Sequence, residues 1–313
     1  MVPHRRRTFA LAAGAVAATL VLVSCGGGKE QQAPPAKGAS APLFDELPKQ
    51  YQDSKVIKVG SDIAYAPMEF YDEDGKTPIG IDVDIAKALG EQLGVRFEFQ
   101  NGTFDGLIVA LGSKRHDIIM SSMTDNKDRQ EGRDPDTGKK VGPGVDFVDY
   151  YMAGVSIMVQ KGNPSGIKSV DDLCGKVVAY QRGTIHADAV EAHNEENCKP
   201  RGLPMVLHDK AKDTEALLEV KQGRAVADVN DTPVAVYNAK TSGGGNDFEV
   251  VGAPFDAGPL GIAVRKEDTQ LRDALLAAVR EIVKNGTYTK IMKKWGATTG
   301  AINLEQVKVN GGT

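Results

Sequence analysis

Residues 80–94 read GIDVDIAKALGEQLG and lie between two short apolar segments, VIKVG at 56–60 and VRFEF at 95–99. The apolar residues of the quoted stretch recur at the spacing of one helix face: Ile81, Ile85, Ala88, Leu89 and Leu93. Asp82 and Asp84 stand near its beginning, where the helix dipole favours negative charge. The flanking segments have the composition and alternation of strands. The run therefore predicts a strand, a helix and a second strand.

The same alternation continues along the chain. A helix over 105–111 and a strand over 117–120 extend the first unit, which predicts a parallel or mixed sheet flanked by helices. A polar stretch at 131–144 contains Gly and Pro and predicts an exposed loop. A second α/β set begins near Val155. Its expected strands cover 155–160, 176–180, 204–207, 225–229 and 248–251, and its expected helices cover 184–194, 213–222 and 233–240. A strand over 261–264 and helices within 271–294 follow.

The N-terminus has the pattern of an export signal. Three arginines at 5–7 precede an apolar segment, and Leu22-Val23-Ser24-Cys25 resembles a bacterial lipobox. We therefore expect residues 1–24 to be a lipoprotein signal peptide and Cys25 to carry the lipid that holds the protein on the outer face of the cell membrane. An uncut membrane anchor is the alternative. Arg6-Arg7-Thr8-Phe9 also resembles a twin-arginine signal, which leaves the export route open. Residues 25–54 are expected to form a flexible tether.

Composition limits the classes of function. The chain has 313 residues, of which 41% are hydrophobic, and its net charge of −4 becomes −7 once the three arginines of the signal are lost. An acidic chain without a basic stripe is a poor nucleic-acid binder, and the mature part is expected to be soluble. Cys174 and Cys198 remain after Cys25, and an even pair in an exported protein favours a disulfide over two separate thiols. No spacing of His and Cys predicts a zinc site, so no metal and no cofactor are expected.

Polar residues follow the expected strands, where open α/β sheets bind ligands. Two α/β lobes without a nucleotide motif predict a ligand held between them. The candidates in the first lobe are Asp62, Tyr65, Phe104, Ser121, Ser122, Thr124 and Arg129. Those in the second lobe are Gln181, Gly183, Thr184, Asn230 and Asp231.

Six segments, in this order, carry a resemblance to a known family: GIDVDIAKALGEQLG, FDGLIVAL, VDFVDYY, GRAVADVNDTP, GIAVRKED and NGTYTKIMKKWG. From about Lys55 to Trp295 the chain resembles the bacterial periplasmic binding proteins for polar amino acids, the solute-binding parts of ABC importers. The resemblance implies an α/β clam-shell of the type II periplasmic-binding fold. Its first lobe would comprise 55–151 and 261–297, its second lobe 153–257, and its tail 298–313. Two crossing segments near Met152 and Leu260 would form the hinge. The insertion at 131–144 and the pair Cys174 and Cys198 depart from the simplest members.

The resemblance also implies a cage for a free amino acid. Arg129 matches the arginine that holds the ligand carboxylate, for which a planar guanidinium is suited. Asp231 matches the aspartate that holds the ammonium, and Ser122 and Thr124 complete the cage. Gly183-Thr184 opens a helix, whose N-terminus favours an anion. Two other interpretations exist: a surface salt bridge of Arg129 with Asp128 or Glu131, and an N-cap role of Asp231 for the helix after Pro233.

Other positions bear on the ligand side chain. Tyr65 and Phe104 match the aromatic residues that sandwich the ligand, although ordinary core packing would suit them as well. Asp62 would attract a cation or an amide and repel an acidic ligand. Gln181 resembles binders of basic amino acids, whereas Asn230-Asp231-Thr232-Pro233 resembles the glutamine type. The expected ligand is therefore glutamine, arginine, lysine or histidine.

These features predict a binding protein and not an enzyme. A monomer would capture the amino acid and deliver it to an ABC permease, and through the permease to its ATPase, with no nucleic-acid partner. One alternative is a dehydratase acting on prephenate-like acids, for which Asp62 or Asp228 could serve as general acid. Another is a sensor module, which would need a separate membrane partner.

Overall fold

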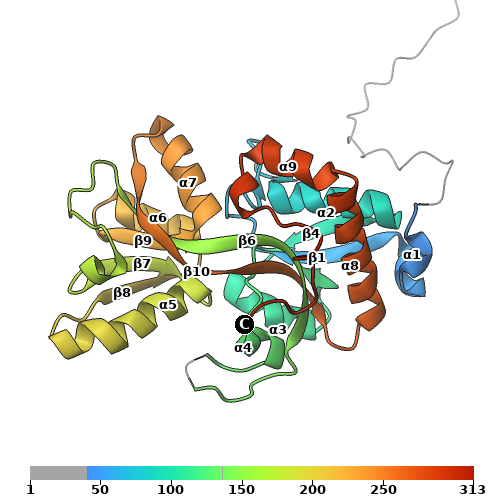
Figure 1. Cartoon of the computed structure of the whole chain (residues 1–313), viewed down its shortest axis with the longest axis horizontal. Coiled ribbons are helices and arrows are strands. Elements are labelled where there is room, and N and C mark those ends of the chain that lie inside the picture. Colours follow the sequence, from blue (N-terminus) through green and yellow to red (C-terminus); the bar gives the residue numbers. More distant parts are fainter. Residues whose placement is uncertain (1–40, 136) are drawn as a thin grey trace, which may run out of the picture. The chain divides into compact units, whose positions relative to one another are not determined.

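The computed structural model describes residues 41–135 and 137–313 and contains an eight-stranded sheet in the order β4-β1-β5-β10-β6-β9-β7-β8 (Figure 1). The stretch at 80–94 forms helix α2 (Ile81–Leu93), as its apolar spacing predicts, and Gly94 ends it with a left-handed φ of 69°. The flanking segments form β1 (Val56–Ser61) and β4 (Arg96–Asn101), which pair in parallel. β5 (Ile118–Ile119) pairs with the other edge of β1. The expected mixed α/β architecture is therefore confirmed.

Two long antiparallel strands, β6 (Val145–Gln160) and β10 (Phe248–Arg265), form the middle of the sheet. The sequence predicted separate short strands at 155–160, 248–251 and 261–264, and each of these is part of a longer strand. Gly and Pro between 252 and 261 indicate breaks, but here they produce shifts in the β6–β10 register instead of ending the strand.

On one side of this pair lie β1, β4 and β5, which with their helices we call the first lobe. On the other side lie β9 (Ala227–Asp231), β7 (Val177–Gln181) and β8 (Val206–Lys210), which with their helices we call the second lobe. Because β6 and β10 run through the expected crossings at Met152 and Leu260, the exact lobe boundaries stay a prediction.

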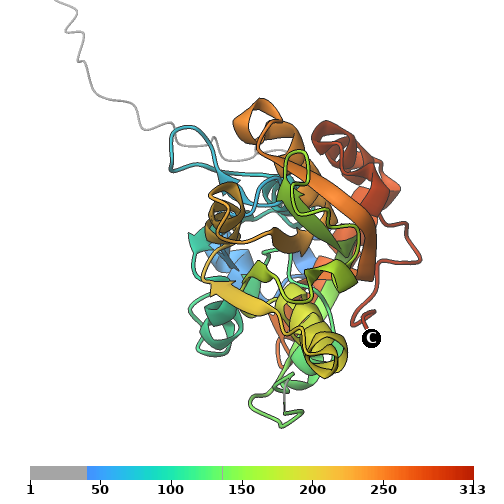
Figure 2. The ribbon, with the colours of Figure 1, turned by 90° about the vertical axis from the view of Figure 1, so that its left-hand side faces the viewer.

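Helices cover both faces of the sheet. The α-helices are α1 (Lys49–Ser54), α2 (Ile81–Leu93), α3 (Leu107–Gly112), α4 (Lys127–Glu131), α5 (Ile185–His193), α6 (Asp213–Lys221), α7 (Thr232–Thr241), α8 (Thr269–Lys284) and α9 (Thr287–Trp295). Short turns of helix are η1 (Phe44–Glu46), η2 (Phe104–Gly106), η3 (Val170–Leu173), η4 (Asn194–Cys198), η5 (Lys199–Arg201), η6 (Ser242–Gly244) and η7 (Thr298–Gly300). A hairpin of β2 (Phe70–Tyr71) and β3 (Pro78–Ile79) was not predicted. In the first lobe α2 packs against α8 and α9 (Figure 1). In the second lobe α5 (yellow) and α7 (orange) flank the strands from opposite sides (Figure 2).

Alternate residues of the central strands enter different cores. Ile118 and Val148 belong to the core beneath α2 and α8, whereas their neighbours Ile119 and Phe147 belong to the core beneath α3. This alternation follows from the two-residue period of a strand. Apolar side chains are therefore buried on both faces of the sheet, as helices on both faces require.

The prediction of a flexible tether over 25–54 is wrong for the last part of that range. Leu47 and Tyr51 are 0% and 4% exposed, and their side chains join the core of the first lobe. Burial of these two apolar groups holds η1 and α1 in place. The signal peptide, the lipobox and Cys25 lie outside the described residues.

The tail at 298–313 packs against the first lobe. Ile302 and Val307 are buried in the same core as α2. The backbone N–H of Gly312 donates to Asp125 Oδ2 at 2.8 Å, and Val309 bridges to Val148 of β6. The segment after the last expected helix thus covers the strand edge near α4.

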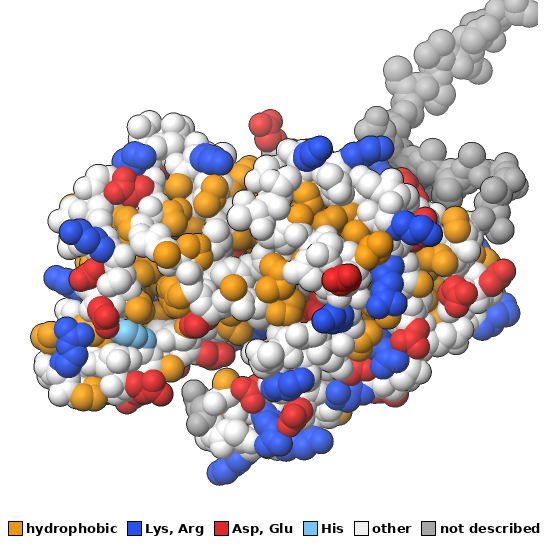
Figure 3. Space-filling model, viewed as in Figure 1, with side chains coloured by type: hydrophobic (Ala, Val, Ile, Leu, Met, Phe, Trp, Pro, Cys, Tyr) orange, Lys and Arg blue, Asp and Glu red, His pale blue; other side chains and the backbone are white. Residues whose placement is uncertain are grey.

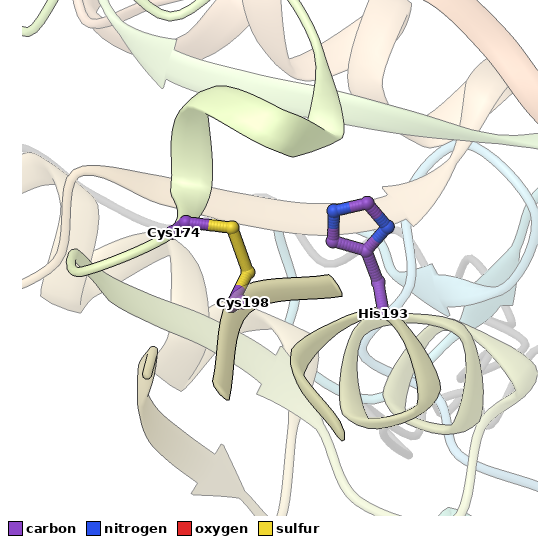
Figure 4. A group of neighbouring side chains, drawn as sticks. All are labelled: Cys174, His193 and Cys198. Carbon is purple, nitrogen blue, oxygen red and sulfur yellow. A yellow bond between two sulfur atoms is a disulfide. The ribbon is translucent and has the colours of Figure 1, made fainter. Parts of the chain in front are cut away.

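The predicted disulfide between Cys174 and Cys198 is present, with a Cα–Cα distance of 5.1 Å (Figure 4). It ties the residue after η3 to the last residue of η4 in the second lobe. His193 lies beside it, with one donor atom within 4.8 Å of both sulfurs, a proximity that the sequence did not predict. Because the sulfurs are bonded to each other, they offer no thiolates to a metal. His193 Nε2 lies instead 3.1 Å from Asp171 Oδ1.

The surface carries charges of both signs. On the face drawn in Figure 3, basic and acidic side chains are interspersed over both lobes. Within residues 41–135 and 137–313, no helix combines the length and the apolar composition that crossing a membrane requires.

Candidate functional site

A small cavity is lined by the ends of strands from both lobes. The first lobe contributes Asp62, Tyr65, Glu69, Phe104, Ser121, Ser122, Thr124 and Arg129. The second lobe contributes Gln181, Thr184, Ile185, His186 and Asp231. The free space is about 10 Å³, close to the least that one water molecule needs. Some of the polar groups around it contact one another across the two lobes.

The guanidinium of Arg129 reaches this cavity from α4. Asn126 caps that helix by accepting the backbone N–H of Arg129 at 2.9 Å. Arg129 Nη1 donates to the carbonyl of Thr124 at 2.7 Å, and Nη2 donates to the carbonyl of Gly183 in the other lobe at 3.0 Å. The cation also lies 5.6 Å from the ring centre of Phe104.

The alternative of a surface salt bridge for Arg129 does not describe these contacts. Glu131 pairs with Arg133 at 2.6 Å, and the guanidinium of Arg129 is held by two carbonyls. Burial lowers the pKa of Arg129 from its usual value, and the carboxylates of Asp188 and Asp231 oppose that effect. Arg129 is thus a cation in a confined site, and a ligand carboxylate could accept hydrogen bonds from its guanidinium.

Asp231 ends β9 and points its carboxylate at the opposite lobe. Its Oδ2 accepts the hydroxyl of Tyr65 at 3.0 Å, and its backbone N–H donates to the same hydroxyl at 2.9 Å. Its Oδ1 lies 3.2 Å from His186 Nε2. Asp231 does occupy the N-cap position of α7, but its side chain makes no capping hydrogen bond. The carboxylate is therefore turned to the cavity and not to the helix.

Asp62 and Gln181 meet across the cavity. Gln181 Nε2 donates to Asp62 Oδ2 at 2.8 Å and to the carbonyl of Ala211 at 3.1 Å. Both side chains are buried, and Asp62 Oδ1 has no hydrogen-bond partner among the described residues. Burial raises the pKa of Asp62, and the bond from Gln181 lowers it in part. One oxygen of this carboxylate therefore remains available to a donor.

Two of the predicted site residues do not line the cavity. Asn230 is fully buried and donates to Asp228 Oδ2 at 2.8 Å and to Asp213 Oδ1 at 3.3 Å. It lies on the face of β9 opposite to Asp231, since adjacent residues of a strand point to opposite sides. Gly183 is exposed and contributes its carbonyl to Arg129. The other ten predicted residues line the cavity.

Thr184 and the two serines have defined partners. Thr184 caps α5, because its hydroxyl accepts the N–H of Ala187 at 3.2 Å while donating to the carbonyl of Gln181 at 2.7 Å. Ser121 Oγ donates to Glu69 Oε1 at 2.9 Å and accepts the N–H of Asp62 at 2.9 Å. Ser122 Oγ contacts Glu69 Oε2 at 3.3 Å.

Three residues that line the cavity were not predicted from the sequence: Glu69, Ile185 and His186. Glu69 is 1% exposed, and burial together with the charge of Asp82 raises its pKa well above the usual value. Burial also raises the pKa of Asp82, to about 7. A signal existed for His186, since it stands two positions after a capping Thr184 at the end of a strand. Glu69 had a weaker one, as the single acid in the segment APMEF.

Taken together, the lining has more acidic than basic groups. The lining holds the carboxyl groups of Asp62, Glu69 and Asp231 and the basic side chains of Arg129 and His186. A zwitterion could place its carboxylate at Arg129 and its ammonium at Asp231. A further donor on its side chain would then meet Asp62, since opposite charges and hydrogen-bond donors favour that carboxylate.

Comparisons with known proteins agree with this fold. The family model described as bacterial extracellular solute-binding proteins, family 3, matches residues 57–298. An arginine-binding protein of Corynebacterium glutamicum is 29% identical over 306 residues, which cover 95% of this chain and 94% of that protein. An arginine-binding extracellular protein of Bacillus subtilis is 31% identical over 241 residues, which cover 77% of this chain and 86% of that protein.

Solved structures are also similar. An ancestral arginine-binding protein bound to glutamine has a TM-score of 0.67 at 35% identity, covering 78% of this chain and 98% of that chain. An ancestral amino acid-binding protein, a precursor of cyclohexadienyl dehydratase, has a TM-score of 0.67 at 36% identity, covering 79% of this chain and 97% of that one. These neighbours are two-lobed amino acid-binding proteins.

Proposed function

The chain belongs to family 3 of the bacterial extracellular solute-binding proteins, the amino acid-binding proteins of ABC transport, and from this premise we propose that its own ligand is a polar, non-acidic L-amino acid. Binding would bridge the two lobes and favour the closed arrangement, in which both sets of contacts are available at once. Catalysis is not needed for that role.

One observation carries the proposal: Arg129 and Asp231 come from different lobes and line one cavity. The two charges match the two charged groups that every free amino acid presents. The carboxylate would replace carbonyl oxygens as the acceptor for Arg129, and the ammonium would join Tyr65 and His186 around Asp231. Because the free space is small, these side chains and the lobes must move apart to admit a ligand.

The side-chain end of the cavity supports a basic amino acid or glutamine. Asp62 has one carboxylate oxygen free of described partners, and Gln181 lies beside it. Acidic ligands would meet repulsion from the carboxylate of Asp62. The relatives named above bind arginine, and one similar structure holds glutamine. We propose arginine, lysine, histidine and glutamine as the ligand set, with cationic side chains preferred.

The setting of this function is also a proposal. Relatives are extracellular or periplasmic, and the lipobox ending at Cys25 supports attachment to the outer face of the cell membrane by a lipid. There the protein would act as a monomer and pass its ligand to an ABC permease. The ATPase associated with that permease would drive transport.

A dehydratase is the second candidate, and Glu69 is the observation in its favour. A buried carboxyl with a raised pKa can donate a proton. Against it, Asp62 is held by Gln181, and Asp228 is held by Asn230 outside the cavity lining. The pair of Arg129 and Asp231 suits an α-amino acid better than a dicarboxylate.

Calorimetric titration of the mature chain with the common amino acids tests the proposal. We expect arginine, lysine, histidine or glutamine to bind at least tenfold more tightly than glutamate or aspartate, a difference of about 1.4 kcal/mol. Prephenate is expected to be left unchanged in a parallel assay. Heat signals for acidic amino acids alone, or turnover of prephenate, would contradict the assignment.

A substitution at Asp62 tests the proposed selectivity. In Asp62→Asn we expect the preference for arginine over glutamine to fall about tenfold, because the amide cannot offer a negative charge to a cationic side chain. A thermal-shift series over the same amino acids measures this ranking. Asp247→Asn is the matched control, since Asp247 pairs with Lys221 outside the cavity lining and should leave the ranking unchanged. An unaltered ranking in Asp62→Asn would show that this carboxylate does not face the ligand side chain.

A further inference from the structure

His186 is a buried titratable group that lines the cavity beside Asp231 of the proposed cage. It lies in the first turn of α5, two positions after the capping Thr184, and is 4% exposed. Its Nε2 lies 3.2 Å from Oδ1 of Asp231, whereas the hydroxyl of Tyr65 contacts Oδ2 of the same carboxylate. Asp231 is thus approached from both lobes, by a hydroxyl and by an imidazole.

We propose that His186 couples amino-acid binding to the release of a proton, an inference that rests on the proposed function of Asp231 as the ammonium site. When His186 is neutral, the negative charge of Asp231 is available to the ligand ammonium. Protonated His186 forms an ion pair with that same carboxylate and competes with the ammonium. His186 is therefore a positioning residue that decides how much of the Asp231 charge the ligand receives.

The confined geometry makes the competition strong. An imidazolium 3.2 Å from Oδ1 and an ammonium on the same carboxylate would place two cations side by side, among lining residues that are mostly buried. Water, which weakens such repulsion at a surface, has little room there. Binding therefore favours the neutral imidazole, and a proton carried by His186 has to leave.

The other charged groups near His186 come from several elements. Asp213 of α6 lies close enough for their charges to interact, and burial raises the pKa of Asp213 to about 7. Asp188 belongs to the same helix as His186, and Asp188 and Asp231 both act on Arg129 of α4. Tyr65 of the first lobe faces Asp231. Because Asp213 can also change charge between pH 5 and 8, the test has to separate it from His186.

Calorimetry with L-arginine and L-glutamine as probes, at pH 7.5 and 5.5 and in buffers of different ionisation enthalpy, measures the coupling. For the wild-type protein we expect the Kd to rise about tenfold at the lower pH, with a proton released on binding. The shift should be the same for both probes, since the α-ammonium that they share is the group in competition.

Three variants assign the effect to one residue. His186→Gln keeps an N–H donor near Asp231 without a titratable charge, so its Kd should change less than about threefold between the two pH values. His193→Gln is the matched control on the same helix, where His193 contacts Asp171 far from the cavity lining. It should behave as the wild type does, and Asp213→Asn should keep the proton release.

The outcomes are distinct. If His186→Gln retained the wild-type pH dependence, or if only Asp213→Asn abolished it, the inference would be overturned while the proposed function stood. Failure of both probes to bind at pH 7.5 would overturn the proposed function and this inference with it. Should His186→Gln not fold, NMR of the wild type at pH 6 decides: a probe must shift one imidazole resonance toward the neutral form, and no shift would refute the coupling.

Discussion

Replacing Asp231 by asparagine is expected to weaken the binding of L-arginine and L-glutamine by about three orders of magnitude, or about 4 kcal/mol of binding free energy. Asparagine keeps the size of the side chain and can still accept the hydroxyl of Tyr65, which lies 3.0 Å from Oδ2. It removes the negative charge that the ammonium requires, in a cavity where little water can replace it. Isothermal titration calorimetry of both proteins measures the difference.

A neighbouring aspartate on the same strand provides the control. Asp228 is fully buried, accepts the amide of Asn230 at 2.8 Å and does not line the cavity. Burial raises the pKa of Asp228 well above its usual range, which favours the neutral carboxyl group, so we expect Asp228→Asn to change the local charge little. Its Kd should stay within about threefold of the wild-type value. Binding by Asp231→Asn within tenfold of wild type would show that the ammonium lies elsewhere.

Replacing Arg129 by methionine is expected to cause a loss of similar size, about 4 kcal/mol. Methionine retains the aliphatic stem that packs near Phe104 but removes the donors that now bind the carbonyls of Thr124 and Gly183. The ligand carboxylate would then be buried without a positive partner, and an unpaired buried charge is costly. Far-UV circular dichroism and thermal unfolding would establish that the variant is folded.

Ligand analogues decide whether Arg129 meets the carboxylate. Argininamide, which has a neutral amide in place of the carboxylate, should bind the wild type weakly and should lose little more affinity in Arg129→Met. Such non-additivity is the signature of two groups in direct contact. Arg133→Met is the matched control, because Arg133 is exposed and pairs with Glu131. If Arg129→Met reduced the affinity for arginine and for argininamide by the same factor, Arg129 would stabilise the fold and would not bind the ligand carboxylate.

The sequence predicted the local elements well where one periodicity dominates. The apolar residues of 80–94 lie on one face, so α2 forms as expected between β1 and β4. Prediction from the sequence failed where long-range strand pairing overrides local signals. Gly and Pro within 252–261 indicated an interruption, but β10 stays paired with β6 on both sides of them. Likewise 41–54 has a polar, loop-like composition, yet burial of Leu47 and Tyr51 orders it.

The candidate site shows the same division. Ten of the predicted residues line the cavity because each follows a strand, and the ends of neighbouring strands meet at one edge. Asn230 was wrong as a cavity residue, since strand alternation turns it toward Asp213 and Asp228. Glu69 and His186 were not predicted. The single acid of APMEF and a histidine two positions after a capping Thr184 are local signals too weak to distinguish a side chain that faces a cavity from one that faces solvent.

By itself, the sequence determined the order of strands and helices, the disulfide between Cys174 and Cys198, and the chemical kinds of residue that follow each strand. Those features depend on composition or on residues that are close together in the chain, so a single sequence is enough to predict them. Only the tertiary structure decided which of those side chains share a space. The contact between Tyr65 and Asp231 joins residues 166 positions apart, and the contact between Asp62 and Gln181 joins residues 119 apart. Such pairs arise because the long β6–β10 strands hold two separate cores against each other, a consequence of packing that no local stretch of sequence contains.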